Sequence, residues 1–283
     1  MRFARVSDGQ TTGLAVMGDD GPRAVFGDTA LSDFDAMIAA GGDALERAAA
    51  TVAAIGTAFD PETITFLPPL VRPSKIICLG LNYVDHAAEG GFAPPDFPTL
   101  FARFASSLIG HGAPIIRPKV STHLDYEGEL VAVIGKRGKN IGKADALDHV
   151  IGYSIFNDGT IRDYQRRTPQ WTAGKNFDNS GAFGPWFLTS DELPPGAAGL
   201  KLETRLNGIV MQSASTSDMI FDVATTIELL SSFLTLEAGD VLVMGTPAGV
   251  GAARTPPVFM KHGDVVEIEI ERIGILRNPV VDE

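Results

Sequence analysis

Two acidic residues that alternate directly before an apolar run constrain this chain more than any other feature. Glu127 and Glu129 flank Gly128, and the apolar residues 130–134 follow at once. Alternate side chains of a strand point to the same face, so both carboxylates would project side by side from a strand that is otherwise buried. Two like charges at this spacing repel each other, and they raise a carboxyl pKa unless a cation lies between them.

A hard divalent cation would relieve this repulsion, because Mg²⁺ and Mn²⁺ prefer all-oxygen ligands. Asp158 comes just after a second apolar segment, 151–156, and supplies a third carboxylate. The sequence therefore predicts that Glu127, Glu129 and Asp158 bind Mg²⁺ or Mn²⁺. The simpler alternative is a half-exposed strand that carries two solvated acids.

The composition limits the class of partner. The chain has 283 residues, enough for one large domain or for a large and a small one. Its hydrophobic fraction of 45% and its 31 glycines and 18 prolines indicate a compact protein with many turns. The net charge of −12 argues against binding to nucleic acid or to anionic membranes. We expect a small-molecule substrate, and an acidic one would need positive charge gathered at a metal or at a few bases.

Three features favour a cytoplasmic protein. No apolar run approaches membrane-spanning length, and no secretory signal is expected at the start of the sequence. The single cysteine, Cys78, lies in an apolar run and cannot form an intramolecular disulfide, which fits a reducing compartment.

The pattern of segments predicts an α+β fold that is mainly β. Residues 1–70 form a small N-terminal α+β domain in this interpretation, and a proline-marked linker leads into a catalytic domain at 71–283. Strands are expected at 75–79, 100–104, 127–134, 151–156, 202–206, 241–244 and 265–270. One clear helix is expected at 220–234, with Asp222 as its N-cap. Strands without regular helices between them favour a closed or rolled β architecture.

His86 and Glu89 are the clearest candidates for acid–base chemistry. They follow an apolar strand and lie three residues apart, so one helical turn would put them on the same face. The carboxylate would then fix the imidazole tautomer and help it to take a proton from water. The glycines and prolines of residues 90–95 would let this segment hinge as a lid. The alternative is a surface histidine–glutamate pair on an exposed turn.

Cationic and amide side chains are dense between residues 157 and 175. They are Arg162, Gln165, Arg166, Arg167 and Lys175. Next to Asp158, such donors would suit a substrate carboxylate or a developing oxyanion. Trp171, Phe177 and Trp186 interleave the polar residues as pocket walls would. The alternative is a solvated surface loop.

A glycine-rich turn at residues 245–251 closes another apolar strand. Its backbone amides and the hydroxyl of Thr246 would grip an anion, although the Lys-Ser/Thr ending of a phosphate loop is missing. Covalent catalysis is not expected, because the sequence has no Gly-x-Ser-x-Gly motif and Cys78 has no polar neighbours.

The order of these motifs resembles the fumarylacetoacetate hydrolase superfamily, and in particular its bacterial acylpyruvase and fumarylpyruvate hydrolase members. The matching segments are 79–89, 125–136, 152–165, 171–177, 219–222 and 236–251, which span most of residues 71–277. The resemblance implies a mixed β-sandwich roll that binds Mg²⁺ or Mn²⁺ and often forms a homodimer. It also implies a small N-terminal domain like that of bacterial members.

The resemblance also implies roles for individual residues. By position, Glu127, Glu129 and Asp158 match the metal ligands. His86 and Glu89 match a water-activating dyad, and Lys175 matches the cation near the scissile carbonyl. The residues that match the substrate-binding positions are Arg162, Gln165, Gln212 and Thr246.

The activity implied is hydrolysis of a C–C bond in a 2,4-dioxo acid, such as fumarylpyruvate or a 2,4-dioxo-3-deoxy sugar acid, with release of pyruvate. The metal would draw electrons from a chelated 2-oxo acid, and His86 with Glu89 would deliver water. The same site would serve an oxaloacetate-type decarboxylase or a 2-oxo-4-enoate hydratase or isomerase. The presence of both His86 and Glu89 favours hydrolysis. A non-catalytic small-molecule-binding protein is the remaining alternative.

Overall fold

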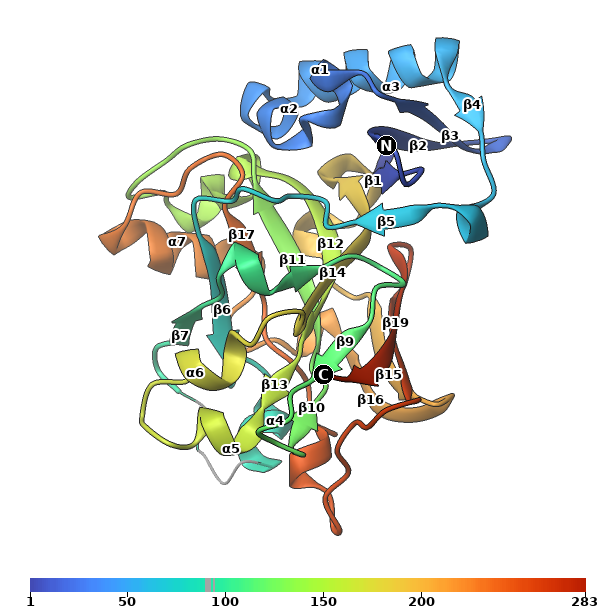
Figure 1. Ribbon diagram of the computed structural model, residues 1–283. Helices are drawn as coiled ribbons and strands as arrows, with labels where there is room; N and C mark the ends of the chain where they lie inside the picture. The colour runs from blue at the N-terminus through green and yellow to red at the C-terminus, as the bar shows by residue number, and fades with distance from the viewer. Residues whose placement is uncertain (90–92, 94) are drawn as a thin grey trace.

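The computed structural model describes residues 1–89, 93 and 95–283, and it confirms a mainly β, mixed fold with 37% strand and 27% helix. Two sheets form the body of the molecule, and helices pack around them (Figure 1). The helices are α1 (Thr29–Ser32), α2 (Phe34–Ala40), α3 (Gly42–Ile55), α4 (Val84–Glu89), α5 (Arg162–Gln165), α6 (Thr172–Lys175) and α7 (Val223–Phe233). Within the described residues, no helix is long and apolar enough to cross a membrane.

The main sheet runs through the whole molecule. Its strands lie in the order β4 (Thr57–Ala58), β3 (Gly21–Phe26), β2 (Thr12–Gly18), β1 (Arg2–Ser7), β14 (Gly181–Thr189), β12 (Val150–Asp158), β11 (Gly128–Ile134), β17 (Val241–Val243), β6 (Ile76–Gly80) and β7 (Thr99–Ala102). Two further strands join at the side, β5 (Thr65–Leu67) on β1 and β8 (Leu108–Ile109) on β14.

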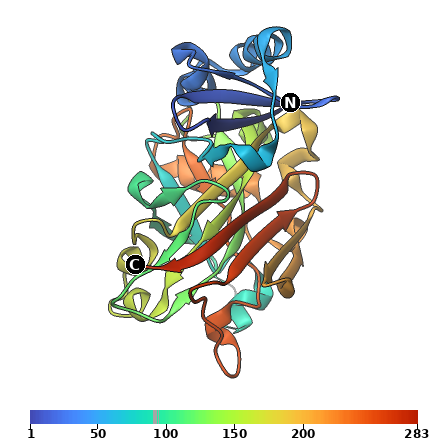
Figure 2. The same cartoon turned by 45° about the vertical axis from the view of Figure 1, so that its right-hand side comes forward.

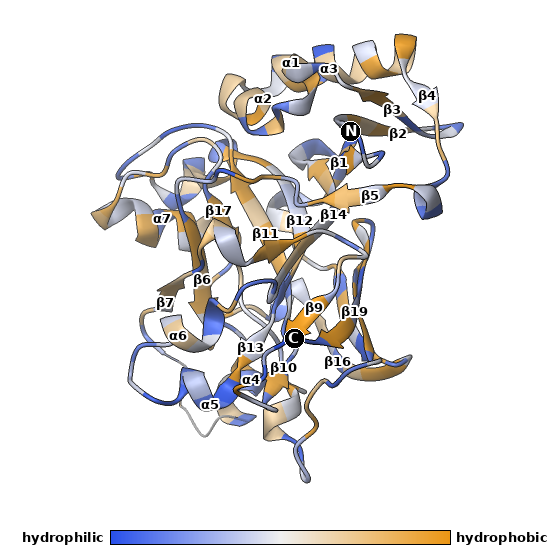
Figure 3. Cartoon of the chain, viewed as in Figure 1, coloured by the Kyte–Doolittle hydropathy of each residue, from blue (hydrophilic) through white to orange (hydrophobic). Residues whose placement is uncertain are grey.

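A second, five-stranded sheet covers one face of the main sheet (Figure 2). Its order is β16 (Ile209–Ser215), β15 (Lys201–Leu206), β18 (Val265–Ile270), β19 (Gly274–Asp282) and β9 (Ile115–Arg117). A short pair, β10 (Leu124–Asp125) with β13 (Thr160–Ile161), stands apart from both sheets. The central strands β6, β11 and β17 are hydrophobic along most of their length, as a strand buried on both faces must be (Figure 3).

The strands within residues 1–70 are part of the main sheet. Strand β1 pairs with β14, so the N-terminal strands extend the central sheet instead of closing on themselves. The pairing satisfies backbone groups that an exposed sheet edge would leave open. Helices α2 and α3 then cover this part of the sheet with Phe34, Ile38 and Leu45, which belong to the same core as Val131 and Val133 of β11.

Helix α7 confirms the predicted helix, and Asp222 caps it by accepting a hydrogen bond from the Thr225 N–H at 2.7 Å. Strands β14 and β19 were not predicted. Both contain a proline, Pro185 and Pro279, and proline is normally a sign against a strand interior. In β14 it lies where the register with β12 shifts between Tyr153 and Ile155.

Several strands of the main sheet have polar residues at the same end of the sheet, where the strands begin or stop. Strands β6, β12 and β17 end there, and β11 begins there, because Gly128 is paired with Asn157. Alternation along β11 sends Leu130 and Ala132 towards the five-stranded sheet and Val131 towards the opposite core. Glu127 and Glu129 share the parity of Val131, so they project from the face that the five-stranded sheet does not cover.

Gly128 lets the two sheets approach each other directly beneath these glutamates. A Cβ atom at this position would lie 2.2 Å from Thr204 Oγ1 and 3.1 Å from Ile268 Cγ2. We therefore expect Gly128→Ala to lower the free energy of unfolding by about 1–3 kcal/mol, because the core would be overpacked. Urea unfolding monitored by tryptophan fluorescence measures this change.

The matched control is Gly142→Ala. Gly142 has an ordinary φ of −71°, and a Cβ there would have its nearest neighbour at 4.0 Å. Its free energy of unfolding should change by less than about 0.5 kcal/mol. Equal effects of the two substitutions would show that the close approach at Gly128 does not limit stability.

Candidate active site

Three carboxylates from two neighbouring strands, β11 and β12, lie close together at this end of the main sheet. Glu127 directly precedes β11, Glu129 belongs to it, and Asp158 is the last residue of β12. One oxygen from each lies within 4.8 Å of the others, and all three residues are buried. The backbone fixes this arrangement, because the Asp158 N–H donates to the Glu127 carbonyl at 2.9 Å.

Buried cations neutralise two of these carboxylates. Lys175 Nζ lies 2.6 Å from Glu127 Oε2 and 2.5 Å from Asp158 Oδ2, while Arg162 Nη1 lies 2.7 Å from Glu127 Oε1. Arg103 pairs with the remaining oxygen of Asp158. Burial alone would raise the pKa of Glu127, but the charges of Lys175 and Arg162 outweigh it and lower that pKa to about 2. Glu127 is therefore a fixed anion.

Glu129 is in a different position. Within the described part of the chain its carboxylate accepts one hydrogen bond, from the Gly245 N–H at 2.6 Å. Burial, followed by the negative charges of Asp158 and Glu127, raises the pKa of Glu129 well above its usual value. A carboxylate that is costly to ionise without a nearby cation is the expected property of a metal ligand.

The charge balance of the whole cluster points the same way. Asp125, Glu127, Glu129 and Asp158 are buried here together with Arg103, Arg162 and Lys175, so four acids face three bases. A divalent cation would change the excess of one negative charge into an excess of one positive charge. All-oxygen donors suit Mg²⁺ or Mn²⁺. The triad therefore fits a divalent metal, and the loaded site would attract an anionic substrate.

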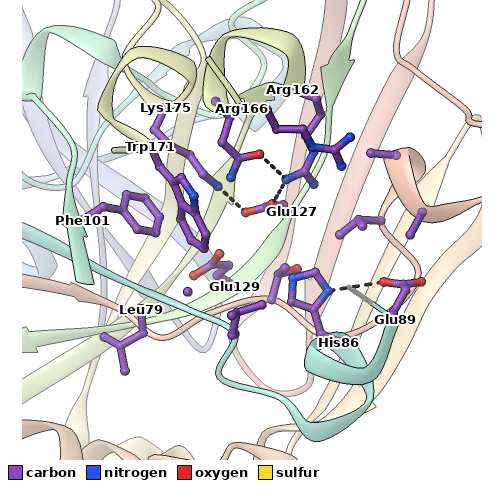
Figure 4. A pocket seen from close by; sticks show the side chains of 17 residues that line it. Leu79, His86, Glu89, Phe101, Glu127, Glu129, Arg162, Arg166, Trp171 and Lys175 are labelled. Atoms are coloured by element: carbon purple, nitrogen blue, oxygen red, sulfur yellow. Dashed lines mark hydrogen bonds and ion pairs between the residues drawn. The ribbon is translucent and has the colours of Figure 1, made fainter. Parts of the chain in front are cut away.

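A cavity of about 350 Å³ opens over the carboxylates (Figure 4). Glu127, Glu129 and Lys175 line it together with His86 and Glu89. Its remaining walls are Leu79, Gly80, Leu81, Phe101, Arg162, Gln165, Arg166, Trp171, Thr246, Val250, Ala252 and Ala253. Two of the three predicted metal ligands, the lysine and the histidine–glutamate pair thus surround one space of small-molecule size, whereas Asp158 is not among the lining residues.

The predicted pair of His86 and Glu89 lies on α4, at one side of the cavity. His86 Nδ1 is 3.3 Å from Glu89 Oε2, and the two side chains are 15% and 22% exposed, which is less than a free surface pair would be. With Nδ1 turned to Glu89, Nε2 is the ring atom left for proton transfer. Of the predicted hinge at residues 90–95, positions 90–92 and 94 lie outside the described residues.

Asn82 fixes the entry to α4. Its side-chain amide donates to the carbonyls of Phe221 and Met244 at 3.0 and 2.7 Å, and its Oδ1 accepts from the Phe221 N–H at 2.8 Å. The chain leaving β6 is thereby tied to the chain leaving β17. This explains how a short helix can hold His86 beside the metal ligands.

The predicted substrate-binding residues separate into two groups. Arg162, Gln165 and Thr246 line the cavity, and Gln165 Oε1 accepts a hydrogen bond from Arg162 Nη1 at 3.1 Å. Gln212 is not among the lining residues. Its amide accepts from the Gly128 N–H at 3.0 Å and donates to Thr246 Oγ1 and the Pro247 carbonyl at 2.7 and 2.8 Å. Gln212 therefore supports the strand and turn from behind.

The expected pocket walls need correction. Trp171 lines the cavity, where it packs against Phe101 and over Gly80, but Phe177 packs against Tyr164, and Trp186 lies in the core beside Phe66. The sequence places these aromatic residues close to the polar ones. It does not show the direction in which each aromatic side chain points.

Two buried residues of the site were not predicted. Arg103 follows β7 in a segment with no motif, so no sequence signal marked it. Asp125 opens the acidic motif, and its carboxylate binds Arg162 Nε at 2.8 Å. It also accepts from the Gly251 and Ala252 N–H groups at 2.8 and 2.9 Å. Asp125 thus orients the arginine that contacts Glu127.

The glycine-rich turn 245–251 does bind anions, but they are the protein's own. The N–H groups of Gly245, Gly249 and Gly251 donate to Glu129, Glu89 and Asp125 respectively. The predicted binding of an anion by these amides is thus seen with carboxylates of the protein itself. The turn holds three acidic side chains of the site in place.

The sequence comparisons agree with this site. The family profile described as "Fumarylacetoacetate (FAA) hydrolase C-terminal" matches residues 75–281, most of the chain. The chain belongs to the fumarylacetoacetate hydrolase family. This confirms the predicted resemblance, and members of the family are enzymes that commonly use divalent metals.

Several proteins with different names are similar in sequence to this chain. An uncharacterized protein of Archaeoglobus fulgidus is 47% identical over 77% of this chain and 82% of its own length. The mitochondrial oxaloacetate tautomerase of Xenopus laevis is 45% identical over 77% of this chain and 69% of its own length. The human mitochondrial oxaloacetate tautomerase FAHD2A is 44% identical, with 77% and 70% covered.

Solved structures of the family match over the full chain. Fumarylacetoacetate hydrolase from the psychrophilic Exiguobacterium antarcticum has a TM-score of 0.87 and 36% identity, with all of both chains covered. The 5-carboxymethyl-2-hydroxymuconate delta-isomerase of Mycobacterium smegmatis has a TM-score of 0.77 and 32% identity, with 100% of this chain and 99% of that chain covered. One fold thus occurs in proteins named for different reactions.

Removal of one carboxylate tests the metal site. We expect Glu129→Gln to weaken Mn²⁺ binding more than about 100-fold, because even the outer partners of metal ligands contribute about 10- to 100-fold. Isothermal titration calorimetry with MnCl₂ measures the affinity. Glu89→Gln, outside the triad, should bind Mn²⁺ within about twofold of the unmodified protein. Equal affinity in all three proteins would mean that the triad holds no metal.

Proposed function

We propose that this chain is a divalent-metal-dependent enzyme that interconverts the enol and keto forms of a short 2-oxo acid, with oxaloacetate as its substrate. The observation that carries the proposal is the shared cavity. It joins two members of the metal-ligand triad, Glu127 and Glu129, to a buried lysine and to a histidine with a carboxylate partner. The named reaction is supported by the relatives called oxaloacetate tautomerases, which are 43–45% identical to this chain.

The chemistry that Mg²⁺ or Mn²⁺ supplies at Glu127, Glu129 and Asp158 is Lewis-acid polarisation of an oxo group. Lys175 contributes a charge that does not titrate near neutrality. Burial would lower its pKa, but Asp158 and Glu127 outweigh this effect and raise it. A buried ammonium group beside the carboxylates can therefore steady negative charge on a substrate oxygen.

His86 is the proposed acid–base group. When an enol becomes a ketone, its hydroxyl loses a proton and the adjacent carbon gains one. With Nδ1 directed to Glu89, His86 Nε2 would take the hydroxyl proton and then give a proton to the adjacent carbon, which leaves the imidazole as it began. The walls formed by Trp171, Phe101 and Leu79 would keep water from the reacting atoms.

The direct test is the decay of enol-oxaloacetate to its keto form, followed by ultraviolet absorbance. We expect decay faster than in buffer with Mg²⁺, and decay at the buffer rate after EDTA treatment. His86→Ala should slow the enzyme by about 10²- to 10⁴-fold, the usual contribution of a general acid or base. If the enzyme did not accelerate enol decay with Mg²⁺ or Mn²⁺ present, the tautomerase proposal would fail.

Hydrolysis of a 2,4-dioxo acid is the second candidate, and the dyad of His86 and Glu89 favours it. Here water would lose a proton to His86 and add to the distal carbonyl. The C3–C4 bond would then break, and C3 would take a proton. A panel of acylpyruvates, oxaloacetate and 2-oxo-4-enoates, assayed with and without EDTA, separates hydrolase, decarboxylase, tautomerase and hydratase activities. Binding without turnover of any of them would indicate a small-molecule-binding protein.

Arg166 is expected to favour substrates with a second carboxylate. It lines the cavity beside Arg162, and it forms no ion pair within residues 1–89 and 95–283. We expect Arg166→Gln to raise the KM for a 2-oxo dicarboxylate by about tenfold, the order expected for a charged hydrogen bond. The KM for a 2-oxo acid of equal length with a neutral end should change little.

Arg167→Gln is the matched control. The Arg167 guanidinium stacks on the Tyr164 ring at 3.6 Å and is absent from the cavity walls described above. It should leave the KM values for both substrates unchanged. If Arg166→Gln raised both KM values equally, a role in recognising the second carboxylate would be excluded.

A further inference from the structure

Gly249 connects the metal-binding strand to the histidine–glutamate pair through its backbone N–H and its backbone carbonyl. Its N–H donates to Glu89 Oε1 and Oε2 at 3.0 and 3.2 Å. Its carbonyl accepts the Tyr126 hydroxyl at 3.0 Å and Arg254 Nε at 3.4 Å. We call Tyr126, Gly249 and Arg254 the Gly249 anchor. Both backbone polar groups of Gly249 are thus used, the N–H on Glu89 and the carbonyl on Tyr126 and Arg254.

The position of Gly249 is fixed by more than these bonds. Its φ of +103° is in the region that favours glycine, and an added Cβ would lie 2.1 Å from the Met211 carbonyl oxygen. Arg254 Nη2 donates to the same Met211 carbonyl at 2.7 Å. Gly249 is therefore held against β16, which restricts the direction in which its N–H points toward Glu89.

Glu89 keeps the protonation state that its hydrogen bond from Gly249 needs. Burial would raise the pKa of Glu89, but the hydrogen bonds from His86 and the Gly249 N–H lower it. Glu89 is thus an anion held between the imidazole and the Gly249 N–H.

Tyr126 and Glu89, the two side chains that Gly249 connects, are each close in sequence to a residue of the site. Tyr126 is fully buried and directly precedes Glu127, a member of the carboxylate triad. Glu89 is the last residue of α4, which carries His86. The anchor therefore links the strand of the metal ligands to the far end of α4, while Asn82 holds the near end.

We propose that Tyr126 and Arg254 are positioning residues, which act through Gly249 and Glu89 to set His86 relative to the metal ligands. Neither is among the cavity-lining residues described above, so neither is proposed to touch the substrate. The inference rests on the proposed function, because it takes His86 to be the acid–base group.

A double-mutant cycle tests the proposal. Tyr126→Phe removes only the hydroxyl, and we expect kcat to fall about 3- to 10-fold, the value of one neutral hydrogen bond. The KM and the Kd for Mn²⁺ should stay within about twofold. In the His86→Ala background, Tyr126→Phe should have no further effect, because its influence passes through the missing imidazole. An equal loss in both backgrounds would overturn the proposal.

Two further variants keep the test decisive. Tyr153→Phe also removes a buried tyrosine hydroxyl, but one that faces the Gly196 backbone, and it should leave kcat unchanged. Arg254→Gln removes the second donor to Gly249, and it should lower kcat in the same His86-dependent way. If Tyr126→Phe did not fold, Arg254→Gln would carry the cycle alone.

A measurement without turnover separates this proposal from the proposed function. The ¹⁵N resonances of the His86 ring should move in Tyr126→Phe and stay in place in Tyr153→Phe. Moved resonances in a protein that converts no 2-oxo acid would retain the anchor and reject the function. Unmoved resonances in an active enzyme would reject the anchor and retain the function.

Discussion

An imbalance of buried charge is the constraint on which this site depends. Asp125, Glu127 and Asp158 each have a cation of the protein beside them, whereas Glu129 has a backbone N–H. Removing an unpaired carboxylate from water costs on the order of several kcal/mol, even after the protein relaxes. A divalent cation offsets that cost. It also gives a local positive charge to a chain whose net charge is −12.

The fold delivers these charges through the ends of strands. Alternation along β11 directs Glu127 and Glu129 to one face, while Gly128 on the other face lets the second sheet pack closely. The turn after β17 then supplies amides to Glu129, Glu89 and Asp125. Hydrogen bonds from this one turn therefore hold Glu129, Glu89 and Asp125, the partner of Arg162, in fixed positions relative to one another.

Much of this was predictable because it depends on local chemistry. Strand alternation predicts that Glu127 and Glu129 lie side by side. An apolar strand that ends at Asp158 predicts the third carboxylate of the triad. Helical spacing and an N-cap at Asp222 predict α7. Other features depend on contacts between distant segments, which no local pattern encodes. The pairing of β1 with β14, the ion pair of Arg103 with Asp158, and the inward turn of the 245–251 amides are of this kind.

Two of the strands that were not predicted, β14 and β19, each contain a proline. Pro185 and Pro279 lie within strands because the long sheets tolerate a missing donor where the register shifts or a partner ends. The reaction is harder to predict than the site for a chemical reason. Tautomerisation, decarboxylation and C–C hydrolysis all pass through an enolate of a 2-oxo acid, so they require the same ligands and the same lysine.

That shared step can be measured alone, as exchange of the C3 hydrogens of 2-oxoglutarate into D₂O, followed by ¹H NMR. The acid is stable, so exchange reports enolisation without cleavage. With Mg²⁺ the protein should accelerate exchange above the buffer rate, and both EDTA and Glu129→Gln should abolish the acceleration. Exchange at the buffer rate in the Mg²⁺-loaded protein, or acceleration that survives Glu129→Gln, would contradict a metal-dependent enolising site.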